Sequence, residues 1–377
     1  MNILIAGDFC PQNRVAELFE NDEFSKVLGE VKPVAESSDY AIVNLECPII
    51  RGKEKPIVKC GANLCCSDRV VSAVKWAGFD CLTLANNHFR DFGDEGVNNT
   101  LSECKKNDID TVGGGPSILE ASKSLIKQLN GKTIAIINCC ENEFSIATET
   151  KGGSNPLNTI KQYYAIKEAK RMADFVLVIV HGGHELWQLP SPRMKETYHF
   201  FIDAGADAVV NHHQHCYSGY EVYKEKPIFY GLGNFCFDKG EKKNDIWELG
   251  YMVMLHIGKD ISFDTIPYRQ CGASPVVNIL SEKDKSLFKT NIEKINCVIA
   301  DDKKLQQEFS DYLSKKSSDF RFVVTPYRKK ILTSLFNKGL LPSFFPRENY
   351  LLLREMFTCE SHYDTFLYYI NKQIEKI

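Results

Sequence analysis

The sequence predicts an α/β fold with two packed sheets flanked by helices, a four-layer αββα sandwich, followed by a C-terminal helical extension. Short apolar runs alternate with segments of helical periodicity through about the first 270 residues, which is typical of α/β proteins. The runs are apolar along their whole length, as in strands covered on both faces. Residues 281–377 instead show amphipathic helical periodicity. We therefore expect two domains, 1–274 and 275–377.

The expected elements follow from these runs and from the turn residues between them. Asn130-Gly131 separates two apolar runs and predicts a hairpin, and the KEKP segment at 224–227 predicts another. Strands are expected at 2–6, 40–45, 79–84, 109–112, 175–180, 208–210, 250–257 and 261–267. Helices are expected at 14–20, 93–106, 159–172 and 193–204.

Composition indicates an ordinary globular chain of 377 residues, with 44% apolar and 25% charged residues. The net charge of −3 gives no reason to expect a nucleic-acid partner. No apolar run approaches the roughly 18 residues of a transmembrane segment, and the N-terminus lacks the basic region of a signal peptide. The fourteen cysteines are scattered, which favours reduced thiols in the cytoplasm. A zinc site at Cys60, Cys65 and Cys66 is a minor alternative, because its spacing matches no common zinc motif.

Three histidines follow the apolar run that ends at Val210. His212, His213 and His215 lie within four positions, where a strand end can hold imidazoles still around a metal ion. In an extended backbone His213 and His215 would point to the same side. The alternative is a polar loop of hydrogen-bonded histidines.

Other strand ends carry oxygen or imidazole groups too. An Asp after Gly is by itself usually a turn residue, and a lone Glu before Pro is usually solvated. Together, however, the polar residues at these strand ends form the mixed carboxylate and imidazole set that divalent metals bind. These residues are Asp8, Glu46, Asn87 with His88, and His181 with Glu185.

Five motifs in this order resemble the bacterial capsule-synthesis CapA family (PGA_cap domain), which is associated with poly-γ-glutamate synthesis. They are GDFCP, NLECPI, LANNHFRDFG, HGGHE and NHHQH…YGLGNFCFD, and the resemblance covers about residues 1–270. That family is similar in fold to calcineurin-like metallophosphoesterases. The resemblance therefore implies a metallophosphoesterase-like sandwich and a site with two metal positions.

The resemblance also implies a role for each motif residue. Asp8 and His215 would hold the first metal; Asn87, His181 and His213 would hold the second, with Glu46 between them. His88, held by Asp91, would protonate a leaving group or contact the substrate oxyanion. Glu185 is a further catalytic candidate. Additional candidate metal residues are Cys10, His212, Asn234 and Asp238, of which His212 is expected to support the ligands.

Two positions depart from the phosphoesterase pattern. Cys10 stands where those enzymes have a histidine, and Glu46 stands where they have a bridging aspartate. The first position is therefore expected to bind weakly, to use Cys10, or to be empty. The expected cofactor is one or two divalent ions, with Mn²⁺, Fe²⁺ or Zn²⁺ as candidates.

These features lead to one expected function and two alternatives. We expect a metal-dependent hydrolase, phosphoesterase-like, in capsule, poly-γ-glutamate or cell-surface polysaccharide synthesis. The alternatives are an enzyme acting on a γ-glutamyl amide or polymer, and a non-catalytic assembly factor that binds polymer. Expected partners are a small phosphoester or polymer substrate and capsule-synthesis proteins, through which a cytoplasmic protein could associate with the membrane.

Overall fold

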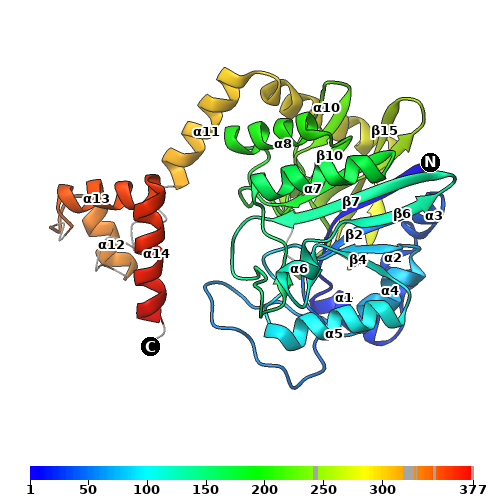
Figure 1. Ribbon diagram of the computed structural model, residues 1–377, viewed down its shortest axis with the longest axis horizontal. Helices are drawn as coiled ribbons and strands as arrows, with labels where there is room; N and C mark the ends of the chain where they lie inside the picture. The colour runs from blue at the N-terminus through cyan, green and yellow to red at the C-terminus, as the bar shows by residue number, and fades with distance from the viewer. Residues whose placement is uncertain (241–244, 317–326, 328, 343–344, 375–377) are drawn as a thin grey trace. The chain divides into compact units, whose positions relative to one another are not determined.

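The computed structural model describes residues 1–240, 245–316, 327, 329–342 and 345–374. The chain forms two compact units, Met1–Gln306 and Gln307–Ile377 (Figure 1). The boundary expected at residue 274 stays a prediction. Helix α10 (Glu282–Ile299) follows that position, and its Phe288 and Ile292 pack into a core of the first unit.

The larger sheet has eight strands and begins with the N-terminal strand. Its order is β16-β15-β14-β1-β2-β3-β4, and β13 also pairs with β1. Four neighbours run parallel: β1 (Asn2–Phe9), β2 (Tyr40–Leu45), β3 (Cys81–Thr83) and β4 (Asp110–Val112). The remaining strands are β13 (Asn234–Cys236), β14 (Leu249–Ile257), β15 (Ile261–Gln270) and β16 (Val277–Ile279).

The smaller sheet has six strands in the order β11-β12-β10-β9-β7-β6. Its parallel neighbours are β7 (Lys132–Cys140), β9 (Phe175–His181), β10 (Ala208–His212) and β12 (Lys226–Phe229). Antiparallel strands β6 (Leu125–Leu129) and β11 (Tyr220–Tyr223) close its two edges through hairpins. Both predicted hairpins are confirmed, and Asn130 and Gly131 have the positive φ values, 49° and 77°, of a tight two-residue turn. A separate two-stranded sheet joins β5 (Gly114–Gly115) and β8 (Gly153–Ser154).

Side chains that alternate along each strand build the layers. Ile3 and Ile5 of β1 share one core with residues of the smaller sheet, whereas Leu4 and Ala6 face the opposite side. That opposite side is covered by α1 (Asn13–Glu20), α2 (Phe24–Leu28), α3 (Lys32–Glu36), α4 (Arg69–Trp76) and α5 (Gly93–Lys106). Helices α7 (Thr159–Met172) and α8 (Pro192–Ala204) cover the outer face of the smaller sheet (Figure 1). The predicted αββα fold class is confirmed.

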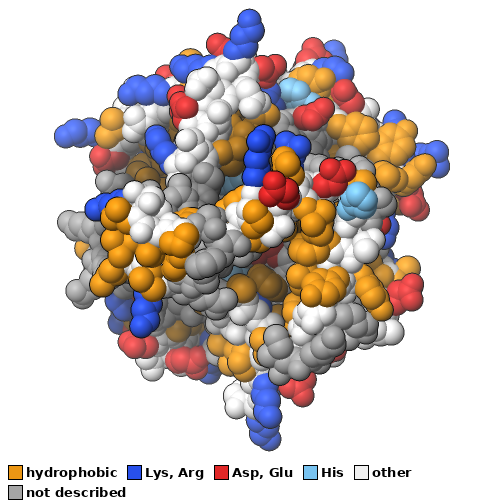
Figure 2. All heavy atoms as spheres, turned by 90° about the vertical axis from the view of Figure 1, so that its left-hand side faces the viewer, with side chains coloured by type: hydrophobic (Ala, Val, Ile, Leu, Met, Phe, Trp, Pro, Cys, Tyr) orange, Lys and Arg blue, Asp and Glu red, His pale blue; other side chains and the backbone are white. Residues whose placement is uncertain are grey.

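Helices follow the sandwich, as predicted. After α10 come α11 (Asp302–Lys316), α12 (Lys330–Asn337), α13 (Arg347–Thr358) and α14 (Glu360–Ile374). Two short helices, α6 (Ile118–Ala121) and α9 (Asp245–Glu248), lie within the first unit. The face in Figure 2 shows basic and acidic side chains interspersed with hydrophobic ones.

Among the helices that the structure describes, none combines the length and the apolar character needed to cross a membrane.

Candidate metal centre

The carboxyl ends of strands from both sheets meet at one edge of the sandwich. Asp8 lies near the end of β1, and Glu46 directly follows β2 in the larger sheet. His181 ends β9 in the smaller sheet, and its ring lies 3.8 Å from Asp8 Oδ1 and 3.6 Å from Glu46 Oε1. Residues far apart in the sequence therefore share one small volume, as the strand-end pattern predicts.

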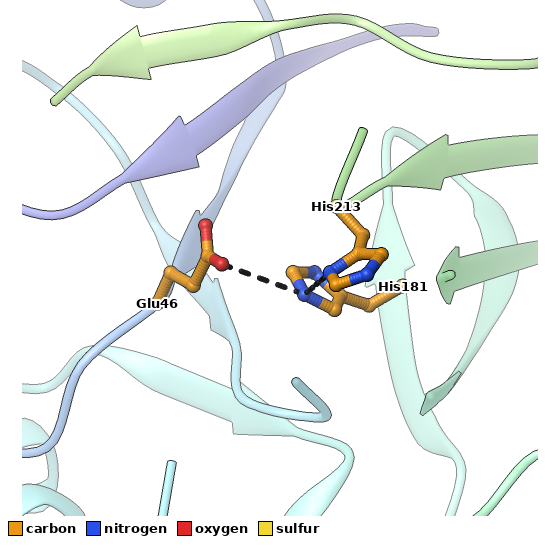
Figure 3. Close-up of side chains that lie close together, drawn as sticks. All are labelled: Glu46, His181 and His213. Atoms are coloured by element: carbon orange, nitrogen blue, oxygen red, sulfur yellow. Dashed lines mark hydrogen bonds and ion pairs between the residues drawn. The ribbon is translucent and has the colours of Figure 1, made fainter. Parts of the chain in front are cut away.

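One group of possible ligands consists of Glu46, His181 and His213 (Figure 3). His181 Nε2 lies 3.6 Å from Glu46 Oε1, 3.0 Å from His213 Nδ1 and 3.0 Å from Asn87 Oδ1. Donor atoms about 2.1 Å from a shared ion are about 3.0 Å apart in an octahedron and about 3.4 Å apart in a tetrahedron. The observed separations match these edges, so the four side chains could hold one ion.

A second group consists of Asp8, Glu46 and His215. His215 Nε2 lies 3.5 Å from Glu46 Oε1, and its Nδ1 lies 3.9 Å from Asp8 Oδ2. Asn234 Oδ1 accepts a hydrogen bond from His215 Nδ1 at 2.9 Å, which leaves the Nε2 lone pair facing Glu46. Because Glu46 belongs to both groups, it has the placement that a bridging ligand requires.

Burial controls the charges of this site. Glu46 is fully buried, and neither of its carboxylate oxygens has a hydrogen-bond partner. Burial, followed by the charge of Asp8, raises the pKa of Glu46 well above its ordinary value. Burial also raises the pKa of Asp8 to about 7, lowers the pKa of His215 to about 3, and lowers that of His181 well below its ordinary range. Unpaired carboxylate beside neutral imidazole is a donor set that a divalent cation satisfies.

The backbone that carries the histidines is not extended. Strand β10 ends at His212, and His213 and His215 have φ values of 89° and 53°. The expectation that an extended strand aligns these two side chains is therefore wrong, although both rings do approach Glu46. The backbone N–H of His213 donates to Asp8 Oδ2 at 3.0 Å, which helps to hold this turn in place. Left-handed backbone at two non-glycine residues is costly and is concentrated at functional sites.

His88 directly follows Asn87 in the chain and has the predicted partner. Its Nδ1 lies 2.7 Å from Asp91 Oδ2, and Asp91 also forms a buried ion pair with Lys59. Lys59 Nζ lies 3.2 Å from His88 Nδ1, and the backbone N–H of Leu64 donates to Asp91 Oδ2 at 2.7 Å. The loop between β2 and α4 is thereby anchored to the segment that carries His88. Sequence reasoning missed Lys59, since a lysine in a loop has no distinguishing pattern.

Two more site residues were missed. Asn44, inside β2, donates from Nδ2 to Asp8 Oδ1 at 2.7 Å, and its Oδ1 accepts from Thr83 Oγ1 at 3.2 Å. An amide within the otherwise apolar run YAIVNL was a signal that could have revealed it. Glu143 follows β7 and accepts from Asn87 Nδ2 at 3.4 Å. Its loop position carries no such signal.

Several predicted residues lie outside the two ligand groups. Cys10 is buried in the core on the outer side of the larger sheet. Asp238 accepts hydrogen bonds on both carboxylate oxygens from Arg14, at 2.6 and 2.9 Å. His212 is buried, and its burial lowers its pKa to about 4. Within the described residues no further group of three ligands occurs, so Cys60, Cys65 and Cys66 do not form one.

Glu185 is exposed and follows His181 in the loop after β9. Its charge contributes to the raised pKa of Glu46, after burial and the charges of Asp8 and Cys10. The catalytic role expected for Glu185 stays a prediction.

Comparison with known proteins places this chain in a family. Residues 2–239 match the family described as bacterial capsule synthesis protein PGA_cap. The chain belongs to this family. The family expected from the five motifs is thus confirmed, and the matched PGA_cap region contains every residue of both ligand groups.

Two curated relatives support the assignment to the PGA_cap family. The chain is 35% identical over 248 residues to the capsule biosynthesis protein CapA of Bacillus anthracis, covering 64% of this chain and 60% of the relative. It is 34% identical over 237 residues to the PGA biosynthesis protein CapA of Bacillus subtilis (strain 168), covering 62% of each. The chain thus spans about three-fifths of the length of these relatives.

Among solved structures, this PGA_cap chain is similar to a phosphatase from Mycoplasma pneumoniae. The two share 16% sequence identity and a TM-score of 0.46, over 76% of this chain and 96% of the other.

Proposed function

We propose that this PGA_cap protein is a metal-dependent hydrolase that cleaves phosphoester bonds during synthesis of a capsule or cell-surface polymer. The observation that carries the proposal is Glu46, a fully buried carboxylate without hydrogen bonds between two sets of ligand atoms. A protein that only binds polymer gains nothing from a buried carboxyl group without hydrogen bonds, which is costly to bury whether it is charged or neutral. The names of the relatives, capsule biosynthesis and PGA biosynthesis proteins, support the pathway.

The residues fit two divalent ions that share Glu46. Asp8 and His215 would complete one position, and Asn87, His181 and His213 would complete the other. When bound, such ions supply positive charge that activates water for attack and neutralises charge on the phosphoryl oxygens.

The protein itself would supply the proton for the departing oxygen. Asp91 Oδ2 can only accept at His88 Nδ1, and Lys59 Nζ, which also lies near this nitrogen, pairs with Asp91 Oδ1 instead of donating to the ring. His88 is thereby held with Nε2 available to carry the transferred proton. The ion pair with Lys59 keeps Asp91 fixed while this happens. His88 thus acts as the general acid, and Asp91 as the group that orients it.

Metal analysis and turnover together test this function. Protein purified without chelator should contain divalent metal and hydrolyse bis(4-nitrophenyl) phosphate with added Mn²⁺. The variant His213→Ala should lose metal and activity together, whereas His88→Ala should retain metal and lose turnover of an alkyl phosphate ester, whose leaving group needs a proton. His256→Ala is the matched control, because His256 lies on β14 and contacts Asn2 and Asp264 instead of the site.

The same experiment separates the alternatives. Absence of metal, together with unchanged polymer binding in His88→Ala, would contradict the hydrolase and favour an assembly factor. Release of free amine from a γ-glutamyl amide, without phosphoester turnover, would favour amide hydrolysis.

A cytoplasmic location and contact with capsule-synthesis proteins belong to the same proposal. Ten of the fourteen cysteines are buried, as reduced thiols commonly are, which supports a reducing compartment. Cell fractionation followed by detection of the protein in the soluble and membrane fractions tests this part.

A further inference from the structure

We propose that Glu143 is a positioning residue that holds Asn87 and His213 in the orientation required to bind one of the two metal positions. The inference rests on the proposed metal centre and goes beyond it by assigning a role to a residue outside both ligand groups. Glu143 lies in the loop after β7. Its Oε2 accepts from Asn87 Nδ2 at 3.4 Å, and its Oε1 lies 3.7 Å from His213 Nε2.

The first consequence concerns the amide of Asn87. A carboxylate only accepts hydrogen bonds, so Glu143 selects the orientation in which the Asn87 NH₂ group faces outward. Asn87 Oδ1 then faces inward, where it lies 3.0 Å from His181 Nε2. Without an acceptor at this place the Asn87 amide could flip, and its N–H groups would then point toward the cation.

The second consequence concerns the tautomer of His213. An acceptor beside Nε2 favours the tautomer with its proton on Nε2. The lone pair of His213 is then on Nδ1, the atom that lies 3.0 Å from His181 Nε2. One carboxylate therefore directs two ligands from different sheets, since Asn87 follows β3 and His213 follows β10.

The loop that carries Glu143 is fixed to the same segment. Ser145, two residues further on, donates from Oγ to Asn87 O at 2.7 Å and accepts from the backbone N–H of Arg90 at 3.0 Å. Ser145 is fully buried, whereas the Glu143 side chain is 35% exposed. The carboxylate can thus be removed without opening the core.

The effect should be confined to one metal position. Among the described residues, Glu143 contacts Asn87 and His213, which lie at the position that includes His181, whereas His215 at the other position is oriented by Asn234. Loss of Glu143 should therefore weaken the binding of one ion and leave the binding of the other unchanged. A general loss of negative charge would instead weaken both.

Calorimetric titration of metal-free protein with Mn²⁺, followed by electron paramagnetic resonance, tests this selectivity. Wild type should bind two ions and give the spectrum of a coupled pair. Glu143→Ala should bind one ion with unchanged affinity and the other about 10–100-fold more weakly, with a spectrum of isolated Mn²⁺. Glu143→Gln should lose less Mn²⁺ affinity than Glu143→Ala, because the one carbonyl oxygen of glutamine can still accept a hydrogen bond from one of the two partners. Glu149→Gln, an exposed carboxylate in the same loop, is the charge-matched control.

The outcomes separate the two proposals. Two ions bound with wild-type affinity in Glu143→Ala, with the coupled spectrum intact, would overturn the role of Glu143. Equal weakening of both ions, or an equal effect of Glu149→Gln, would also overturn it. Failure of wild type to bind Mn²⁺, Fe²⁺ or Zn²⁺ would instead overturn the metal centre itself. Unfolding temperatures of the metal-free variants show whether each one is folded.

Discussion

The side chains of His215 and Asn234 are joined by a hydrogen bond in which His215 Nδ1 lies 2.9 Å from Asn234 Oδ1. The amide is itself fixed, because its Nδ2 group donates to the carbonyl oxygens of His215 and Trp247 at 3.2 and 3.3 Å. Asn234 Oδ1 therefore accepts the Nδ1 proton, and the Nε2 lone pair of His215 faces Glu46.

We expect Asn234→Ala to weaken Mn²⁺ binding at the Asp8–Glu46–His215 position by about 10–100-fold, because the ring loses its fixed tautomer. The other position should keep its affinity, which is the reverse of the pattern expected for Glu143→Ala. Calorimetric titration measures both. Asn278→Ala, an exposed residue of β16, is the control. Unchanged binding at both positions in Asn234→Ala would show that the hydrogen bond does not orient a ligand.

The stability of the metal-free protein should depend on pH through two kinds of group, carboxyl groups and histidines, whose pKa shifts change stability in opposite directions. Asp8 has a pKa raised from 3.8 to about 7, and that of Glu46 is raised well above 4.5. The folded state therefore binds their protons more tightly, so they reduce stability as pH rises through this range. His215 and His212 have pKa values lowered from 6.5 to about 3 and about 4, so they increase stability up to about pH 6.5.

Below pH 6.5 the carboxyl groups and the histidines change stability in opposite directions as pH rises. Above pH 6.5 only the carboxyl groups still make stability depend on pH. We expect metal-free protein to lose stability from pH 6.5 to 8, by at most about 1.4 kcal/mol per pH unit for each titrating carboxyl. Urea unfolding with EDTA at several pH values measures this slope. Glu46→Gln should flatten the slope, and bound metal should remove it. A stability of the metal-free wild type that rises across this range would contradict the pKa directions.

Much of the fold followed from local patterns in the sequence. Helices α5 and α7 have the predicted limits, since a 3.6-residue apolar period over fourteen positions is a strong signal. The candidate ligands Asp8, Glu46 and His181 were identified because each one lies at the end of an apolar run. These inferences need only the chain near the residue in question.

The remainder depended on contacts across the fold. Asp238 ends a family motif, yet Arg14 binds both of its oxygens, and nothing near either residue in the sequence shows that pairing. Glu143 and Lys59 lie in loops whose course is set by docking against the segment from Asn87 to Asp91. The left-handed backbone at His213 is likewise not encoded by a glycine.

His88 provides the test of proton donation. We expect His88→Ala to lower the turnover of an alkyl phosphate ester about 10²–10⁴-fold, because an alkoxide leaving group needs a proton. The loss should be much smaller for 4-nitrophenyl esters, whose leaving group departs as a stable anion. Steady-state rates for the two esters at equal metal content give the comparison. Equal losses for both would show that His88 binds substrate without donating a proton.

Asp91 should matter for folding as well as for activity, because it compensates a buried cation. The side chain of Lys59 is 2% exposed and that of Asp91 is fully buried. Asp91→Ala leaves the ammonium group without its carboxylate, so we expect a loss of about 3–5 kcal/mol in the free energy of unfolding. Chemical denaturation measures it. Lys59→Met combined with Asp91→Ala should recover part of the loss, because the uncompensated charge is gone.

The exposed pair of Lys26 and Glu23 is the control for this effect. Their side chains are 62% and 36% exposed, so water screens the interaction and Glu23→Ala should cost less than about 1 kcal/mol. If Asp91→Ala loses as little unfolding free energy as Glu23→Ala, the Lys59 ammonium reaches water once its partner is removed. The loop between β2 and α4 would then be free to move away from His88, and its anchoring at Asp91 could not be what holds the general acid in place.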